Sequence, residues 1–339
     1  MRGAVLALAA TAAHAAAASD AVDTCGRIAA ASDRLACYDA QARARGVAPA
    51  ATAAASDAPV IAPSSMLAPA TRGSERSPLG ERWAIGTRDA LFDLRPHEPT
   101  YVLPARYSDR MNQRPGTPAR PPGPADLSLD DIEAKFQLSF KFRMARFDSP
   151  WAPSVWGGYT QQSQWQVYNS GRSAFFRNTD HAPELMLAWH PDVDLGPFRW
   201  RLFNVGLLHQ SNGRSEVLSR SWNRVYTQFG LESGNLVLLV RPWVRLSEDA
   251  AEDDNPDIRD FLGHGDVVIS YRAGAHQFAL KGRQNFGSGR GYAEASWSFP
   301  LLRQLRGYVQ ASSGYGESLI DYNWRQNTVG VGVSLFDWQ

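Results

Sequence analysis

The chain has almost no net charge and, beyond its first residues, no long hydrophobic run. Its formal net charge is +1 and its mean hydropathy is −0.35. The near-neutral charge gives no reason to expect a nucleic-acid partner, and the sequence contains neither a Gly-rich phosphate loop nor a metal-spaced His/Cys cluster. These features would ordinarily favour a soluble protein of one or two domains. They do not exclude a membrane barrel, because strands of alternating polarity also give a modest average hydropathy.

Cysteine is scarce, and Cys25 and Cys37 are the only two in 339 residues. They follow residues 1–19, whose basic start, largely apolar centre and small residues near Ala15 predict a secretory signal peptide. Export would place both thiols in an oxidising periplasm, where a disulfide across the short helical stretch between them is expected rather than two free thiols. Residues 20–130 are accordingly expected to form a periplasmic extension and linker.

Between residues 48 and 127 the chain is rich in Ala, Pro, Ser and Arg. Motifs such as PGTPARPPGPA cannot sustain strand pairing, so we interpret this stretch as a mostly disordered linker. Residues 83–103 carry several apolar side chains. Two alternatives stay open for them, namely local order or packing against the domain that follows.

From residue 131 to residue 339, segments of alternating apolar and polar residues recur, which is typical of antiparallel strands. Their polar faces carry Arg, Lys and Glu, and their other faces carry Leu and Val, as expected when one face lines a lumen and the other meets lipid. We therefore predict an all-β, transmembrane antiparallel β-barrel. Residues 314–323 either hold one more strand or extend the strand before them, and the even number usual in bacterial barrels favours twelve strands. The eleven recognised segments are residues 134–145, 155–168, 184–189, 198–211, 222–231, 236–246, 266–272, 277–285, 291–299, 306–313 and 327–336.

Two neighbouring segments end their apolar faces on hydrogen-bonding side chains. In residues 198–211 the apolar face ends at His209 and Ser211, and in residues 222–231 it begins at Asn223. If the hairpin closes symmetrically about Glu216, His209 lies directly opposite Asn223. Unpaired polar groups are costly in hydrocarbon, so this placement favours a functional role over chance.

These three residue types suit acyl transfer. A serine hydroxyl needs a neutral imidazole to take its proton as it attacks an acyl carbon, and a third group must hold the imidazole in the right tautomer. Ser211, His209 and Asn223 fit the three roles, although the Gly-x-Ser-x-Gly motif of the α/β-hydrolases is absent. Because an amide carries no charge, a second electrostatic contribution is expected at this site.

The polar turn between the two segments offers oxygen ligands of the kind that calcium prefers. Asn212, Gly213, Arg214 and Ser219 carry carbonyl or hydroxyl oxygens, and a divalent ion there would help to polarise groups facing an oxyanion. Two carboxylates lie in nearby loops, Glu216 and Asp254. They either hold another ion or are simply solvated.

The stretch HQSNGRSEVLSRSWNRVY, residues 209–226, resembles the signature of the outer membrane phospholipase A family. DDNPDI, SGYGESLIDYN and VGVGVSL resemble the same family in the same order, so the similarity covers roughly the last 200 residues. The resemblance implies a twelve-stranded outer membrane barrel with phospholipase A1/A2 activity, a carboxylic ester hydrolase acting on phospholipids and lysophospholipids. It also implies a Ser–His–Asn triad on the outer surface and a homodimer activated by calcium.

Carried over residue by residue, the resemblance makes Ser211 the nucleophile, His209 the general base and Asn223 the orienting residue. It implies that calcium is held by the backbone oxygen of Arg214, by Ser219 and by Ser173 contributed from the second subunit. Around Ser173 the sequence departs from the expected Ser-Pro pair. Gln161 resembles the glutamine that meets its symmetry mate in the dimer.

Two other classes of function compete with this reading. A passive porin or structural barrel would have the same polar lumen faces but would not need the outward His, Ser and Asn. A soluble β-sandwich esterase would have to bury both faces of these strands and would not need aromatic residues near the strand ends.

Overall fold

The computed structural model describes residues 25, 27–44, 77–85, 91–147, 153–302 and 305–338. The predicted signal peptide, residues 1–19, lies outside the described residues. The chain divides into two compact units, Met1–Pro69 and Ala70–Gln339. In the first unit the predicted disulfide is confirmed, because Cys25 and Cys37 are bonded with their Cα atoms 5.7 Å apart. Cys37 lies in helix α2 (Ala31–Ala44), which is rich in Ala and has Asp33 in its first turn.

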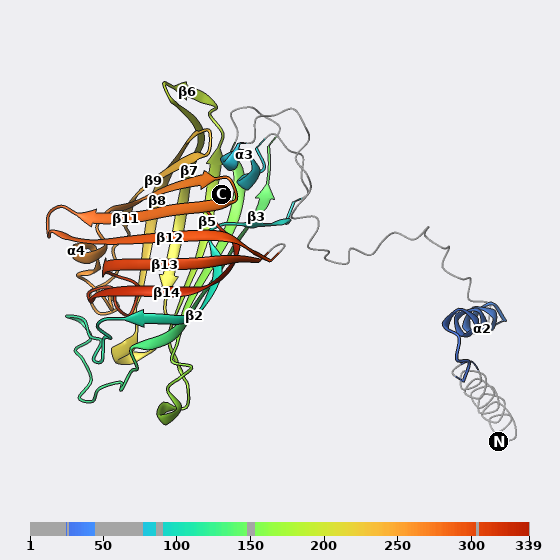
Figure 1. Ribbon diagram of the computed structural model, residues 1–339, viewed down its shortest axis with the longest axis horizontal. Helices are drawn as coiled ribbons and strands as arrows, with labels where there is room; N and C mark the ends of the chain where they lie inside the picture. Colours follow the sequence, from blue (N-terminus) through green and yellow to red (C-terminus); the bar gives the residue numbers. More distant parts are fainter. Residues whose placement is uncertain are drawn as a thin grey trace, which may run out of the picture. The chain divides into compact units, whose positions relative to one another are not determined.

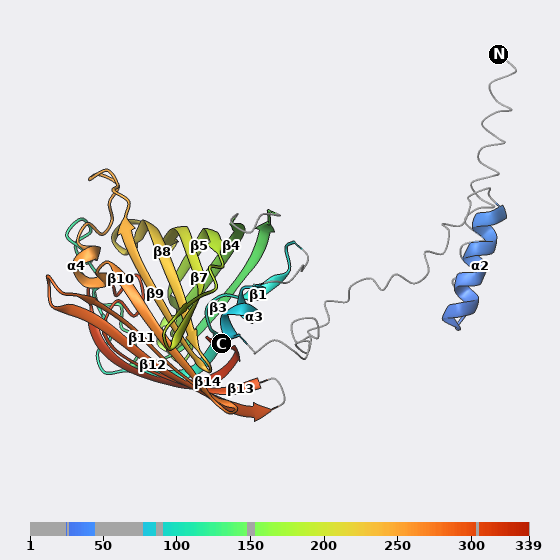
Figure 2. The same ribbon diagram turned by 90° about the horizontal axis from the view of Figure 1, so that it is seen from above.

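The second unit contains a closed antiparallel barrel of twelve strands within the described chain, as predicted (Figures 1 and 2). β3 pairs with both β2 and β4, and β14 pairs with β2, so the sheet returns on itself. β7 and β8 lie in the wall opposite β13 and β14. The strands are β2 (Thr100–Ser108), β3 (Ile132–Ala145), β4 (Ser154–Trp165), β5 (Phe176–Trp189), β7 (Phe198–Ser211), β8 (Ser221–Ser233), β9 (Leu236–Arg245), β10 (Gly265–Ala273), β11 (His276–Asn285), β12 (Arg290–Leu302), β13 (Leu305–Tyr315) and β14 (Arg325–Phe336).

The twelfth strand is β2, and our placement of it was wrong. Thr100–Ser108 lies in the segment that we assigned to the linker, so the barrel begins before residue 131. Proline lacks a backbone N–H and weakens the signal of a strand, and Pro104 is accommodated here where the pairing of β2 with β3 shifts register between Leu103 and Arg106. Residues 316–324 instead form turns, and Ser318 to Tyr322 are buried.

The described residues before β2, 77–85 and 91–99, pack within the second unit. Helix α3 (Pro78–Arg82) is capped by Ser77, whose hydroxyl accepts from the Gly80 N–H at 2.8 Å, and it has a proline at its first position. Leu79 and Trp83 are buried in the main apolar cluster with residues of β4 and β7. β1 (Leu94–Pro96) pairs with β3. The other short elements are η2 (Ser170–Arg172), β6 (Val193–Leu195), η3 (Glu216–Leu218) and α4 (Ile258–Leu262).

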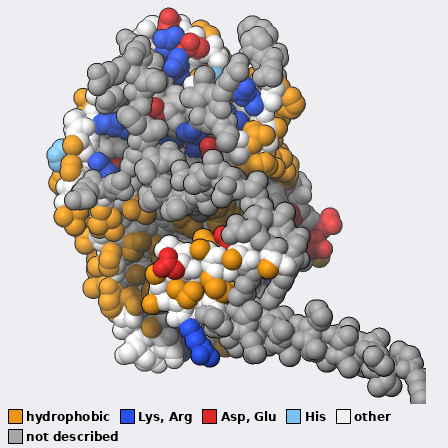
Figure 3. Space-filling model, turned by 90° about the vertical axis from the view of Figure 1, so that its right-hand side faces the viewer, with side chains coloured by type: hydrophobic (Ala, Val, Ile, Leu, Met, Phe, Trp, Pro, Cys, Tyr) orange, Lys and Arg blue, Asp and Glu red, His pale blue; other side chains and the backbone are white. Residues whose placement is uncertain are grey.

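The two surfaces of the barrel wall differ in polarity as the alternation predicts. Apolar side chains on the outer surface form a band over part of the face in Figure 3, and β14 exposes Val329 and Val331 by 47% and 52%. Charged side chains fill the inside, where Arg106, Lys135 and Arg177 are buried. Among the described residues, no helix is both long and apolar enough to cross a membrane.

Candidate active site

The hairpin of β7 and β8 brings His209 and Asn223 into contact. Their Cα atoms are cross-strand partners, as the symmetric hairpin predicts, and the only register shift in this pair lies at the other end, between Trp200 and Leu202. His209 Nδ1 lies 2.9 Å from Asn223 Oδ1. This distance is that of a hydrogen bond, so the amide oxygen accepts from the imidazole in the tautomer that protonates Nδ1.

Ser211 is the last residue of β7 and lies two residues beyond His209, on the same face of the strand. Such a spacing separates Cα atoms by roughly 7 Å, which is within reach of the two side chains. Ser211 pairs with Ser221 of β8 on one side and with His181 of β5 on the other. The three candidate residues therefore share one patch, next to the exposed apolar side chain of Leu207.

The lumen side of the hairpin is packed and hydrogen-bonded behind this patch. Trp222, which is fully buried, donates to Gln210 Oε1 at 3.1 Å, and Arg224 donates to the same oxygen at 2.8 Å. The Arg224 guanidinium also lies over the Trp222 ring, 3.9 Å from its centroid. Packing and hydrogen bonds on the inner face thus fix the residues that alternate with His209 and Asn223.

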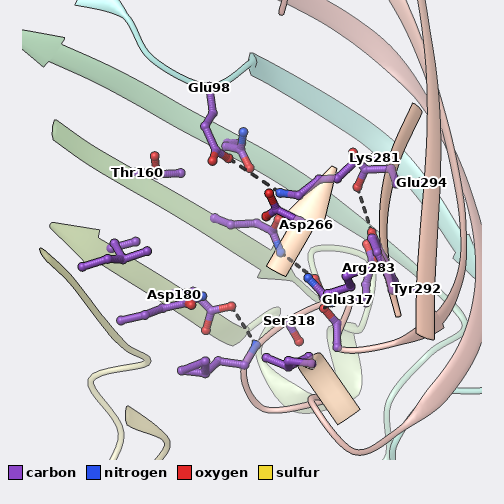
Figure 4. Close-up of a pocket in the computed structure, with 18 of the residues that line it drawn as sticks. Glu98, Thr160, Asp180, Asp266, Lys281, Arg283, Tyr292, Glu294, Glu317 and Ser318 are labelled. Carbon is purple, nitrogen blue, oxygen red and sulfur yellow. Dashed lines mark hydrogen bonds and ion pairs between the residues drawn. The ribbon is translucent and has the colours of Figure 1, made fainter. Parts of the chain in front are cut away.

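A pocket lined by described residues lies in the lumen, apart from this patch. Figure 4 shows it lined by charged groups, among them Glu98, Asp266, Lys281 and Glu317. Such a lining is unsuited to an acyl chain, because burying charge against hydrocarbon is costly. The candidate active site is therefore an open surface site on the outside of the barrel wall.

The turn after Ser211 is held by Asn212. Its side chain donates to Leu218 O at 2.8 Å, and its Oδ1 accepts from the Arg220 N–H at 3.0 Å. Gly213 has φ +59°, a left-handed conformation that suits glycine. Arg220 donates to Ser219 O at 2.6 Å, and burial lowers the pKa of its guanidinium.

Ser219 and Arg214, the candidate calcium ligands of this turn, have different surroundings. The Ser219 hydroxyl donates to Asp254 Oδ2 at 2.5 Å, while Asp254 Oδ1 accepts from Arg120 at 2.9 Å. The Arg214 side chain donates to the backbone oxygen of Arg177 at 3.1 Å. No cluster of three or more His, Cys, Asp or Glu residues suited to a metal occurs in the described part of the chain.

The third candidate ligand, Ser173, is in the loop between β4 and β5. It ends η2 with φ +60° and is exposed. Gln161 lies on β4 and pairs with His181 of β5. The hydroxyl of Tyr159 is 3.3 Å from Gln161 Oε1 and 2.7 Å from His181 Nδ1. A half-buried polar cluster of Tyr159, Gln161 and His181 thus adjoins Ser211.

Two residues beside the patch were not found from the sequence. His181 falls before the β5 segment that we recognised, although the alternation of β5 would have included it had the strand been extended toward its start. Glu248 accepts from Asn223 Nδ2 at 2.9 Å and comes from the loop after β9. A loop residue has no periodicity that marks where it lies, so the sequence offered no signal for this contact.

Comparisons with known proteins agree with the fold. The Phospholipase A1 family matches residues 81–335. A relative from Neisseria meningitidis is 41% identical over 270 residues, covering 77% of this chain and 70% of its own. A phospholipase A1 of Salmonella typhimurium is 38% identical over 270 residues, covering 80% of this chain and 89% of its own.

Solved structures give the same result. The Salmonella typhi outer membrane phospholipase, a dimer with bound calcium, superposes with a TM-score of 0.67 and 36% identity, covering 75% of this chain and 96% of that one. An outer membrane phospholipase A from Escherichia coli, described as an active site mutant with an Asn-to-Ala change, has a TM-score of 0.66 and 36% identity, covering 75% and 96%.

A closed twelve-strand barrel with an apolar outer surface, and with relatives that are phospholipases, defines an integral outer membrane hydrolase. More particularly, the chain belongs to the outer membrane phospholipase A family.

Proposed function

We propose that the chain is a calcium-dependent phospholipase that hydrolyses acyl ester bonds of phospholipids and lysophospholipids at the outer face of its barrel, and that it acts as a homodimer. The observation that carries the proposal is the hydrogen bond between His209 and Asn223, beside Ser211, among lipid-facing side chains. The Asn-to-Ala active site mutant of the Escherichia coli relative supports an asparagine in this role.

The chemistry follows from the tautomer that Asn223 favours. With Nδ1–H donated to Asn223, the Nε2 atom of His209 is the basic nitrogen. Nε2 takes the hydroxyl proton of Ser211 while Oγ bonds to the ester carbonyl carbon. The tetrahedral intermediate then expels the glycerol oxygen, which receives that proton from His209. Water attacks the acyl-enzyme in the same manner, the fatty acid leaves, and Ser211 regains its proton.

The position of the patch suits a substrate that is part of the membrane. Leu207 and Val225, the outward neighbours of His209 and Asn223 along their strands, are 49% and 40% exposed. Acyl chains can lie along this apolar surface while the ester group reaches Ser211. In this arrangement the part of residues 20–130 that precedes β2 would include the periplasmic extension, and β2 itself belongs to the barrel.

The residues of the turn fit a calcium ion. Ser219 brings a hydroxyl oxygen next to the carboxylate of Asp254, and calcium prefers hydroxyl, carboxylate and carbonyl oxygens. Asp254 already holds one positive group, the Arg120 guanidinium. We assign the backbone oxygen of Arg214, the side chain of Ser219 and Ser173 of the partner subunit as ligands. A bound calcium would supply positive charge near the oxygen that becomes negative in the tetrahedral intermediate.

The polar cluster of Tyr159, Gln161 and His181 supports dimerisation. Polar side chains on a lipid-facing surface gain from partners across an interface, since hydrocarbon offers them none. The relative from Salmonella typhi is a dimer. A site completed by the second subunit would keep a lipase inactive while it stands alone in its own substrate.

The competing reading as a passive porin is weaker. Within the described residues the lumen holds a charged network and the turn of residues 316–324, for example where Arg177 pairs with Asp321 at 2.7 Å. A diffusion channel would also have no use for an outward Ser, His and Asn.

The test is hydrolysis of phospholipid by the purified full-length protein in detergent with calcium. Ser211→Ala should reduce hydrolysis by about 10³-fold or more while the barrel stays folded. Ser215→Ala, an exposed serine of the same turn, serves as the matched control and should retain wild-type activity. Full activity of folded Ser211→Ala would refute the assignment.

A further inference from the structure

The amide of Asn223 has a second partner besides His209. Its Oδ1 faces His209 Nδ1 at 2.9 Å, and its Nδ2 donates to Oε1 of Glu248 at 2.9 Å. Imidazole, amide and carboxylate therefore form one chain of hydrogen bonds. We propose that Glu248 is a positioning residue of the hydrolytic site, which orients Asn223 and supplies the negative charge that an amide lacks. This inference rests on the proposed function.

Glu248 is held in place by the loop that carries it. Directly after β9, the Leu246 N–H donates to Asn223 O at 2.8 Å. Further along, Asn255 Oδ1 accepts from the Ser221 N–H at 3.0 Å. The loop of residues 246–257 is thus attached to β8 on both sides of Trp222. Its attachment leaves the Glu248 side chain only 17% exposed.

The negative charge of Glu248 is not cancelled by its neighbours. Arg245 lies 3.3 Å from Glu248 Oε2, but its closer partner is Asp253 Oδ1 at 2.6 Å. Two carboxylates share one guanidinium, so the cluster of Glu248, Arg245 and Asp253 keeps one negative charge. The Oε1 atom that faces Asn223 accepts from the amide and not from Arg245.

A carboxylate in this position has two effects on the amide. It can only accept hydrogen bonds, so it fixes the Asn223 side chain with Nδ2 toward Glu248 and Oδ1 toward His209. It also polarises the amide, which makes Oδ1 a better acceptor and favours the imidazolium that forms when Ser211 is deprotonated. A flipped amide would instead present N–H groups to His209 and lose both effects.

The decisive measurement is a double-mutant cycle on the full-length protein with phospholipid in detergent and saturating calcium. Glu248→Gln should lower kcat about tenfold with little change in KM, because a hydrogen bond to a charged group is replaced by a neutral one. In the Asn223→Ala background the same change should have no further effect, since Glu248 acts through Asn223. Glu252→Gln, an exposed acid of the same loop, is the matched control and should keep the wild-type kcat.

Exchanging the amide at position 223 with the carboxylate at position 248 provides a second, independent readout. Asn223→Asp alone should be impaired, because it places a carboxylate against that of Glu248. The Asn223→Asp/Glu248→Gln double variant lets the new amide donate to the new carboxylate and should recover at least about tenfold of the kcat lost in the single variant. A residue that merely anchored the loop would not produce this rescue.

The outcomes separate the inference from the proposed function. A kcat for Glu248→Gln within twofold of wild type, an equal loss in the Asn223→Ala background, or no rescue by the exchange would each overturn the role of Glu248. Ser211→Ala, measured in parallel, reports on the hydrolytic site itself. If folded Ser211→Ala is inactive while Glu248→Gln is unchanged, only the inference fails. If folded Ser211→Ala is fully active, the proposed function fails as well.

Discussion

The lumen of the barrel holds its polar groups in large, charged networks. Glu133, which is fully buried, accepts from Arg106 at 2.7 Å and from Arg177 Nε at 2.9 Å. Lys135 pairs with Glu317 at 2.7 Å, and neither side chain is exposed. Each of these groups offsets the charge of another, as buried ions must.

The outer face near Ser211 holds fewer polar groups than the lumen, and they form short chains of hydrogen bonds instead of a large charged network. Its chain of contacts runs from His209 through Asn223 and reaches a single carboxylate, Glu248, at the rim. Exposed apolar side chains such as Leu207 surround it. Nothing in the packing of the wall requires these groups, because hydrocarbon side chains would serve the lipid-facing surface better.

The contrast shows where function is to be sought in a barrel of this kind. Polar groups in the lumen stabilise the wall and hold the inner turn, so a change there should affect stability first. Polar groups on the outer face contribute little to the fold, so a change there should affect turnover first.

The largest effect is expected for the general base. His209→Ala should lower phospholipid hydrolysis by about 10³-fold or more, because it removes the imidazole that Asn223 orients to take the Ser211 proton. The folded state, followed by heat-modifiable migration on gels, should not change. His264→Ala, an exposed histidine that precedes β10, is the control. Substantial activity in folded His209→Ala would assign the base elsewhere.

The matching change in the lumen is Glu133→Gln. It should destabilise the barrel by about 3–5 kcal/mol, because Arg106 and Arg177 both lose a buried partner. The temperature at which the folded gel band disappears should fall, while the kcat of the remaining folded protein should stay near wild type. Glu252→Gln on an exposed loop should leave that temperature unchanged. A normal temperature with a strongly reduced kcat would contradict the division between the two faces.

Much of the outer site could be predicted from the sequence, because strand alternation and hairpin symmetry are local rules. Between residues 202 and 211 β7 has no bulge relative to β8, so counting from Glu216 placed His209 opposite Asn223 correctly. The apolar outer face and the polar lumen followed from the same alternation.

The parts that escaped prediction depend on long-range contacts or on local irregularity. β2 was hidden by Pro104 and by the proline-rich sequence that follows it. Glu248 reaches Asn223 only because its loop folds back along β8, and Arg120 meets Asp254 across 134 positions of sequence. Neither contact is marked by a periodic pattern in the sequence, so it can be recognised only in the folded structure.

A smaller effect is expected at the calcium ligands of the turn. Ser219→Ala should raise the calcium concentration for half-maximal activity about tenfold. Arg120→Ala should lower this calcium concentration, because it removes a cation that competes with calcium for Asp254. The change should be only a few-fold, because a partly exposed ion pair is weak. Calorimetric titration of calcium into detergent-solubilised protein checks both without relying on turnover. Ser215→Ala should bind calcium as wild type does, and unchanged binding in Ser219→Ala would remove that ligand.

The smallest effect concerns adjacent residues that face opposite sides of the wall. Gln161 belongs to the outer polar cluster, whereas Gln162 donates to the backbone oxygen of Glu317 in the lumen at 2.9 Å. A pair of glutamines that hydrogen-bond across a twofold axis in lipid is worth roughly 1 kcal/mol. Gln161→Ala should therefore weaken dimerisation about fivefold and leave the folded barrel intact, whereas Gln162→Ala should leave dimerisation unchanged.

Crosslinking and specific activity over a dilution series in detergent with calcium measure this difference. Activity should fall with dilution in parallel with the crosslinked dimer, and the Gln161→Ala curve should shift to higher protein concentration. Because the outer face supplies only one wall for an acyl chain, a monomer should be nearly inactive even with Ser211, His209 and Asn223 in place. Full specific activity in a sample that is wholly monomeric would show that a single barrel completes the site, and the outer cluster would then have another role.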